Sequence, residues 1–216
     1  MSREAKFEFE AAFGVFKFIK KKVIMPLIKQ IIDRSVTVKQ AMAKTCLQPA
    51  EQAAEIIAQS LQNKGKLLLC GNGGSAGDSQ HLAAEFVATL DHTRPRPGLP
   101  AIALTTDTSF LTAYANDFGF EGIFARQVET LGQKGDVLIA ISTSGNSKNV
   151  LAAAKMARQM GMSVIAMTGQ SGGALAAHCD ILLNVPSDIT MHIQECHIAL
   201  GHAITAQVEE LVARQG

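Results

Sequence analysis

The sequence predicts an α/β fold, in which a doubly wound sheet of five parallel strands is flanked by helices and preceded by extra N-terminal helices. Short apolar runs alternate with helix-length intervals over most of the 216 residues, as expected for parallel strands that are covered on both faces. Turns such as Gly135-Asp136 and Gly161-Met162 separate helical segments from the strands after them. The length suits one domain better than two small ones.

The individual elements follow from the spacing of apolar residues. Two amphipathic helices are predicted before the first strand, from Pro26 to about Ala43 and from Pro49 to Asn63. The predicted strands are Lys66–Cys70, Ala101–Leu104, Val137–Ile141, Ser163–Met167 and Ile181–Val185. Further helices are predicted after Ser75, from Lys148 to Met160, and from about Thr190 to Arg214. Ligands of such sheets bind beyond the carboxyl ends of the strands.

The composition narrows the functional classes. The chain is 47% hydrophobic and 18% charged, which is typical of a globular protein and not of a disordered one. A formal net charge of +1 does not favour a nucleic-acid-binding surface. The four cysteines have no paired spacing, so we interpret them as reduced, mostly buried thiols of a cytosolic protein.

Residues 1–24 differ from the rest because they are rich in phenylalanine and end near Lys20-Lys21-Lys22. The segment lacks the layout of a signal peptide and is too short and too charged to span a membrane. It is either a membrane-surface or partner helix, or a dispensable extension, and we favour the extension. The predicted domains are therefore an N-terminal extension, residues 1–24, and a single domain, residues 25–216.

A glycine-rich turn follows the first predicted strand. Gly71, Gly73 and Gly74 interrupt the chain just before a helix, so free backbone N–H groups and the positive end of the helix dipole form an anion site. Along that helix His81 and Glu85 are four residues apart and point the same way. Such a pair is usually an exposed helix pair, but beside an anion site it favours acid/base or metal chemistry.

A second loop, Ser142-Thr-Ser-Gly-Asn-Ser147, directly follows the strand Val137–Ile141. Its hydroxyls and backbone N–H groups can surround a phosphate without a lysine. The chain contains neither a Walker P-loop nor a dinucleotide-binding GxGxxG fingerprint. The two loops together predict a site for a phosphorylated small molecule.

These motifs resemble the sugar isomerase (SIS) domain and, within it, the phosphoheptose isomerase family. The similarity continues through Pro100-Ala-Ile-Ala-Leu104, Ala115-Asn-Asp-Phe-Gly-Phe120 and Ile193-Gln-Glu-Cys-His197, and covers roughly residues 27–212. It implies conversion of sedoheptulose 7-phosphate into D-glycero-D-manno-heptose 7-phosphate, for the heptose of lipopolysaccharide. It also implies a cytoplasmic homotetramer with interfacial active sites and a zinc ion, and no nucleic-acid or membrane partner.

The resemblance implies roles for individual residues. The catalytic pair would be Glu85 and His202. The zinc ligands would be His81, Glu85, Gln194 and His202. The substrate would be held by Asn72, Gly73, Gly74, Ser75, Glu85, Asn116, Asp117, Ser142, Thr143, Ser144, Ser147 and Gln194. Many relatives carry an arginine one turn after the catalytic glutamate, where this chain has Thr89; Arg94 and Arg96 are the candidates to compensate.

The chemistry agrees with this assignment. Ketose–aldose isomerisation moves a proton between C1 and C2 through an enediol, so it needs a base and an acid or Lewis acid. Glu85 suits the base, and His202 suits a proton shuttle. Gln194 and His202 lie about 12 Å apart along a helix axis, so we expect either a distorted helix or ligands from two chains. His197 is the residue most easily confused with His202.

One alternative function remains open at this stage. Some SIS-domain proteins do not catalyse a reaction but bind a sugar phosphate or a replication initiator protein, and these tend to lose the acid/base pair. Glu85 and His202 are both present in this chain, which favours the isomerase.

Overall fold

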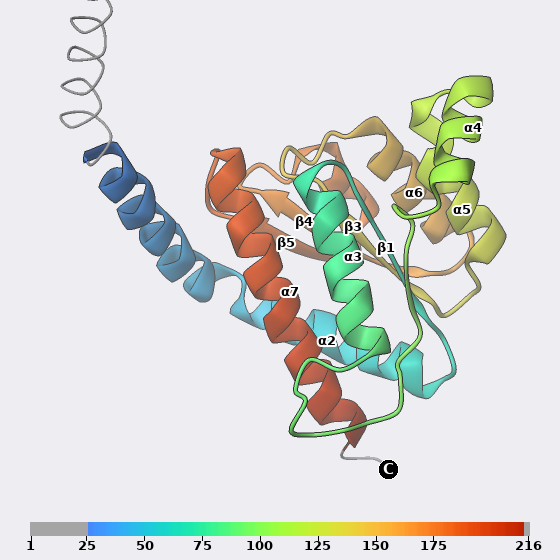
Figure 1. Ribbon diagram of the computed structural model, residues 1–216, viewed down its shortest axis with the longest axis horizontal. Coiled ribbons are helices and arrows are strands. Elements are labelled where there is room, and N and C mark those ends of the chain that lie inside the picture. The colour runs from blue at the N-terminus through green and yellow to red at the C-terminus, as the bar shows by residue number, and fades with distance from the viewer. Residues whose placement is uncertain (1–25, 214–216) are drawn as a thin grey trace, which may run out of the picture.

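A single sheet of five parallel strands forms the centre of the protein, for which a computed structural model describes residues 26–213. The strands are β1 (Leu67–Gly71), β2 (Ala101–Ala103), β3 (Val137–Ile141), β4 (Ser163–Gly169) and β5 (Ile181–Val185), in the spatial order β2-β1-β3-β4-β5 (Figure 1). This is the strand order of a flavodoxin-like sheet. The predicted fold class is confirmed, and every strand end lies within two residues of its predicted position.

Helices precede the sheet and connect its strands. They comprise a helix over residues 26–45, α2 (Leu47–Gln62), α3 (Gly74–Val87), α4 (Thr108–Phe118), α5 (Ile123–Leu131), α6 (Lys148–Gln159) and α7 (Thr190–Ala213). Two short 3-10 turns are η1 (Phe120–Gly122) and η2 (Gly173–His178). The predicted extension, residues 1–24, lies outside the described residues. The first two helices meet at Cys46 rather than near Pro49.

Alternate residues of β1, β3 and β4 supply two separate hydrophobic cores. Leu67 and Leu69 of β1 face one core with α2, α3 and α7, whereas Leu68 and Cys70 face the other with α5 and α6. All five residues of β1 are buried, because helices cover both faces of the sheet. Burying one leucine side chain stabilises the fold by about 1.5–3 kcal/mol. An apolar strand such as β1 is therefore more stable in the interior of the sheet than at its edge.

The sheet has a topological switch point between β1 and β3. The chain passes from β1 to β2 through α3 on one face, and from β3 to β4 through α6 on the other. The two strands end at the same level, with Gly71 paired with Ile141. The loops after them therefore flank the crevice in which doubly wound proteins bind ligands. They are the glycine-rich turn and the loop from Ser142 to Ser147.

Helices α3 and α7 lie side by side and run in the same direction (Figure 1). Three contacts follow one another along the pair: Gln194 with Asp78, His202 with Glu85, and Glu209 with Leu90. The two helices thus align side chains that are more than a hundred residues apart in sequence.

The helix over residues 26–45 extends away from the sheet (Figure 1). Ser35 donates a hydrogen bond to Glu195 of α7, which anchors the middle of this helix. The helix also exposes apolar side chains, namely Leu27, Ile28, Ile32 and Val36. Over the described part of the chain, no helix combines the length and the apolar character needed to cross a bilayer.

Candidate functional site

The glycine-rich turn leads directly into α3. Gly73 precedes the helix with a φ of +57°, a backbone conformation that costs a residue with a side chain about 1–2 kcal/mol. Asn72 exchanges two side-chain amide hydrogen bonds of 2.9 Å with Asn149 of α6. The first turn is therefore tied to the helix that follows the second loop. Asn149 was not among the predicted residues, because a lone buried amide in a helix carries no sequence signature.

Internal hydrogen bonds hold the second loop in shape. The Ser142 hydroxyl donates to the Ser147 hydroxyl at 3.0 Å. The Asn146 side-chain oxygen accepts from the Ala174 N–H at 2.9 Å, which joins the loop to the turn after β4. Gly145 has a φ of +67°, and a Cβ there would lie 2.1 Å from the Gly172 carbonyl oxygen. The loop is thus pre-shaped, with hydroxyl and backbone donors at the carboxyl edge of the sheet.

A cleft of about 380 Å³ lies beside this loop. Its lining residues are Thr143, Ser144, Asn146, Gly169, Gln170, Ser171, Ser187, Asp188, Thr190 and Ile193. The predicted residues Thr143 and Ser144 are among them. The segments after β4 and β5 were not singled out from the sequence, although each follows a strand and the same rule on carboxyl ends applies to them.

Three side chains converge between α3 and α7. His81 Nε2 lies 3.0 Å from Glu85 Oε1, and His202 Nε2 lies 3.5 Å from the same oxygen. The two imidazole Nε2 atoms are 2.8 Å apart. All three residues belong to one chain, so His202 reaches its predicted partners without a second subunit.

This cluster fits a divalent metal ion. Its three ligand atoms all lie within 4.8 Å of one another, and the ligands of a tetrahedral ion with bonds of about 2.1 Å are about 3.4 Å apart. The other carboxylate oxygen of Glu85, Oε2, is buried and has no hydrogen-bond partner among residues 26–213. A carboxylate with one oxygen beside two imidazole nitrogens and its other oxygen buried without a partner is a donor set that could hold a metal ion.

Gln194 lies about two turns before His202 on α7 and faces an earlier turn of α3. Its Nε2 donates to Asp78 Oδ1 at 2.7 Å. Burial raises the pKa of the Asp78 carboxyl, and the hydrogen bond from Gln194 offsets part of that rise. Helix α7 is an α-helix throughout, so the distortion considered above is absent. Because α3 runs alongside α7, Gln194 and His202 contact successive turns of the same neighbouring helix.

The remaining histidine near this region belongs to the core. His197 is buried, and its Nε2 lies 3.0 Å from the Thr168 carbonyl oxygen. Burial lowers the pKa of His197 to about 4, so the side chain is neutral at pH 7. The structure thus separates His197, which faces the sheet, from His202, which faces α3.

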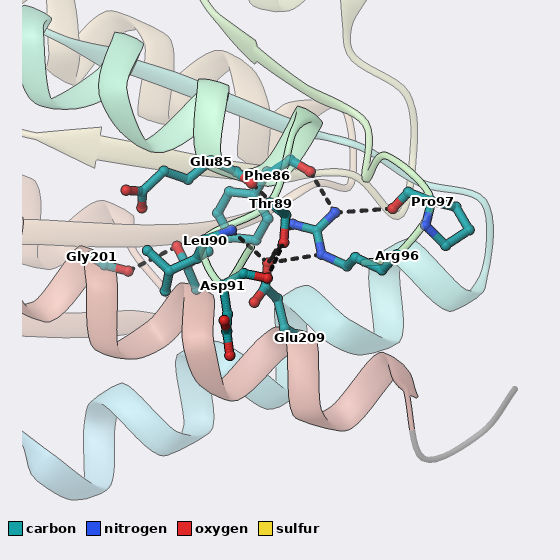
Figure 2. A network of polar contacts seen from close by, with 10 residues as sticks. Glu85, Phe86, Thr89, Leu90, Asp91, Arg96, Pro97, Gly201 and Glu209 are labelled. Atoms are coloured by element: carbon teal, nitrogen blue, oxygen red, sulfur yellow. Dashed lines mark hydrogen bonds and ion pairs between the residues drawn. The ribbon is translucent and has the colours of Figure 1, made fainter. Parts of the chain in front are cut away.

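Neither candidate arginine extends to the cluster. Arg94 forms an exposed ion pair with Glu210. Arg96 is bound to Glu209 and to main-chain carbonyls at the end of α3 (Figure 2). Thr89 also contacts Glu209, at 3.4 Å. Within residues 26–213, neither arginine thus takes the place of the one that the resemblance led us to expect at position 89.

Asn116 and Asp117 lie elsewhere in the fold. Both are exposed on α4, and the amide of Asn116 donates to Asp117 at 2.8 Å. Helix α4 packs on the face of the sheet opposite to α3 and α7 (Figure 1). Within a single chain, these two residues therefore lie away from the cluster of His81, Glu85 and His202. Phe118 and Phe120, next to them, are also exposed.

Helix α7 contributes residues to both the cleft and the cluster. Ile193 lines the cleft and His202 belongs to the cluster, and nine residues correspond to about 13 Å of helix. The Glu85 side chain is 16% exposed, so it is shielded yet accessible. The arrangement can hold an anionic group at one end of a polar molecule and move protons at the other.

Comparison with known proteins gives consistent matches. The SIS domain family matches residues 31–169. The chain is 52% identical over 178 residues to the phosphoheptose isomerase of Roseiflexus sp. (strain RS-1), across 82% of this chain and 89% of that protein. It is 48% identical over 189 residues to that of Aneurinibacillus thermoaerophilus, across 87% and 94%. The structure of phosphoheptose isomerase from Neisseria gonorrhoeae superposes with a TM-score of 0.82 at 47% identity, covering 87% of this chain and 100% of that one.

Proposed function

The chain belongs to the SIS domain family and, within it, to the phosphoheptose isomerases, and we propose on this basis that it converts sedoheptulose 7-phosphate into D-glycero-D-manno-heptose 7-phosphate. The observation that carries this proposal is the convergence of His81, Glu85 and His202 beside two anion-type loops. A protein that only bound a sugar phosphate would not need a shielded carboxylate between two imidazoles.

Glu85 is the proposed base. Its carboxylate removes a proton from C1 of the ketose, and the proton that C2 gains completes the change to the aldose. His202 lies 3.5 Å from the Glu85 oxygen, and its imidazole is suited to move the hydroxyl proton between O1 and O2. Both side chains act from neighbouring helices, so the fold holds the base and the proton shuttle at a set separation.

The proposed cofactor is one zinc ion for each site. Two imidazole nitrogens and a carboxylate oxygen are ordinary zinc ligands, and Gln194 is the fourth residue assigned by resemblance. The amide nitrogen of Gln194 is bonded to Asp78, which leaves its amide oxygen as the possible ligand. Bound zinc would supply Lewis-acid polarisation of the substrate oxygens. Elemental analysis of protein purified without chelator tests the assignment; active protein free of zinc would refute it.

The phosphate is assigned to the pre-shaped loops. The hydroxyls of Ser142, Thr143, Ser144 and Ser147 and the start of α3, with Asn72, Gly73, Gly74 and Ser75, are the proposed substrate contacts. The hydrogen bonds within the second loop support this assignment, because donors held in advance bind an anion with less ordering cost.

We propose a homotetramer in which a second subunit supplies Asn116 and Asp117. The exposed apolar residues of the helix over 26–45 and the exposed Phe118 support an interface, because monomeric proteins rarely expose such surfaces. Light scattering on the purified protein tests the assembly. We place the enzyme in the cytoplasm, at the start of heptose synthesis for lipopolysaccharide.

The reaction itself is tested in deuterated water. The protein is incubated with sedoheptulose 7-phosphate, and NMR follows the aldose product and deuterium at C2. Unphosphorylated sedoheptulose is the matched control, and we expect it to react far more slowly because the phosphate contacts are missing. Binding of the sugar phosphate without any product would favour the non-catalytic alternative instead.

A further inference from the structure

A largely shielded ion pair joins the end of α3 to α7. Arg96 lies in the segment between α3 and β2, and Glu209 lies near the end of α7. Their side chains are 11% and 13% exposed. Arg96 Nε donates to Glu209 Oε1 at 2.8 Å, and Arg96 Nη2 forms an ion pair with the same oxygen at 2.7 Å. A paired guanidinium shielded from water in this way is held far more firmly than a surface ion pair.

Arg96 also bonds two main-chain carbonyl groups of α3, and its Nη1 donates in addition to the Pro97 carbonyl oxygen at 3.0 Å. Nη2 donates to the Glu85 carbonyl oxygen at 3.0 Å, and Nη1 donates to the Phe86 carbonyl oxygen at 2.9 Å (Figure 2). The last carbonyl groups of a helix have no partner within the helix. A guanidinium can bond several of them at once because its donors form a rigid planar fork. The last turn of α3 is thus closed by Arg96.

Glu209 strengthens the same junction from the other helix. It accepts a hydrogen bond of 2.9 Å from the Leu90 N–H, just beyond α3. It lies seven residues after His202, which places both side chains on the same side of α7. The ion pair therefore connects the turn that carries Glu85 with the helix that carries His202.

We propose that Arg96 is a positioning residue for the isomerase, which sets the separation of Glu85 and His202 by clamping α3 to α7. The Glu85 carboxylate extends away from the Arg96 guanidinium (Figure 2), so Arg96 acts through the main chain and does not touch the reacting groups. The inference rests on the proposed function, because it assigns a role in the same reaction.

The first test compares Arg96→Ala with Arg94→Ala. Arg94 is the matched control, since it lies in the same segment and pairs with the adjacent residue of α7, Glu210, but is exposed. We expect Arg96→Ala to lower kcat about tenfold to a hundredfold with little change in KM, because a small displacement of Glu85 affects the chemical step and spares the phosphate loops. Arg94→Ala should match the parent protein.

Two conservative variants keep the test valid if Arg96→Ala folds poorly. Arg96→Lys retains the charge opposite Glu209 but cannot bond both carbonyl groups, so we expect an intermediate kcat. Glu209→Gln should lower kcat in the same direction. The double variant Arg96→Ala/Glu209→Gln should be no worse than Arg96→Ala, because both remove one interaction.

Hydrogen exchange separates this inference from the proposed function. Amides around residues 85–90 should exchange at least about tenfold faster in Arg96→Ala than in Arg94→Ala, whether or not the substrate is correct. If the parent protein does not isomerise the sugar but the two variants still differ in exchange, the proposed function is refuted, whereas the clamping of α3 to α7 by Arg96 is supported. If Arg96→Ala matches Arg94→Ala in kcat and in exchange, the clamp is refuted.

Discussion

Gly201 of α7 packs directly against Leu82 of α3: a Cβ at position 201 would lie 2.6 Å from Leu82 Cδ1. Gly201 precedes His202, and Leu82 follows His81. The two helices therefore pack tightly next to the cluster. A glycine at this point lets the imidazole of His202 reach Glu85, which lies on the other helix.

Gly201→Ala should reduce both stability and activity. The added methyl group has no room beside the buried Leu82, and overpacking of this kind costs about 1–3 kcal/mol. Relief of the clash would push α7 away from α3 and lengthen the distance from His202 to Glu85. Thermal unfolding and kcat are the measurements. Gly77→Ala on α3 is the control, because a Cβ there meets nothing within 4 Å; equal melting temperatures for the two variants would contradict the packing argument.

Glu85→Gln should remove turnover and leave the fold intact. The substitution conserves shape, but an amide cannot accept the carbon-bound proton, and general-base catalysis contributes about 10²–10⁴-fold. The measurements are kcat with sedoheptulose 7-phosphate and the circular dichroism spectrum. Glu51→Gln on the exposed face of α2 serves as the control. Near-parental activity of Glu85→Gln would mean that another residue is the base.

The parts of the fold that could be predicted are those with strong local patterns. β1 and β3 are buried on both faces, so their apolar runs and the loops after them are evident from the sequence. Helix α4 was not delimited: its apolar residues Phe110, Tyr114 and Phe118 recur at helical spacing and contact one another, but none of the residues of this helix is buried.

Contacts between distant segments were beyond the sequence argument. The spacing of Gln194 and His202 was judged along α7 alone, which led to a distorted helix or two chains as the options. Helix α7 is undistorted, and it places Gln194 against Asp78 and His202 against Glu85, so a site completed by a second chain stays a prediction. The bonds of Arg96 could not be predicted for the same reason: nothing local links it to Glu209, 113 residues away.

Gly145→Ala should weaken both the fold and the binding of the substrate. A side chain at its φ of +67° costs about 1–2 kcal/mol, and the new Cβ would lie 2.1 Å from the Gly172 carbonyl oxygen, so the phosphate loop must move. We expect KM to rise about tenfold or more, which corresponds to a loss of about 1.4 kcal/mol in binding. Gly135→Ala is the control, with a φ of +91° and no atom within 4 Å of a Cβ; it should lose stability but keep its KM.

His197 should make the protein less stable in mild acid. Burial lowers its pKa in the folded state to about 4, whereas an unfolded histidine has a pKa of about 6.5. The unfolded chain therefore binds a proton that the folded chain does not, so stability is full above pH 6.5 and declines as the pH falls toward 4. The difference in pKa corresponds to about 3 kcal/mol.

The free energy of unfolding, measured with denaturant at pH 7.5 and pH 4.5 and one fixed protein concentration, should show this loss. His197→Gln keeps an N–H donor for the Thr168 carbonyl, to which His197 is bonded, and has no group that titrates in this range. Between pH 7.5 and pH 4.5, the free energy of unfolding of His197→Gln should therefore fall by about 3 kcal/mol less than that of the parent protein. If both proteins lose the same free energy, other groups cause the acid sensitivity.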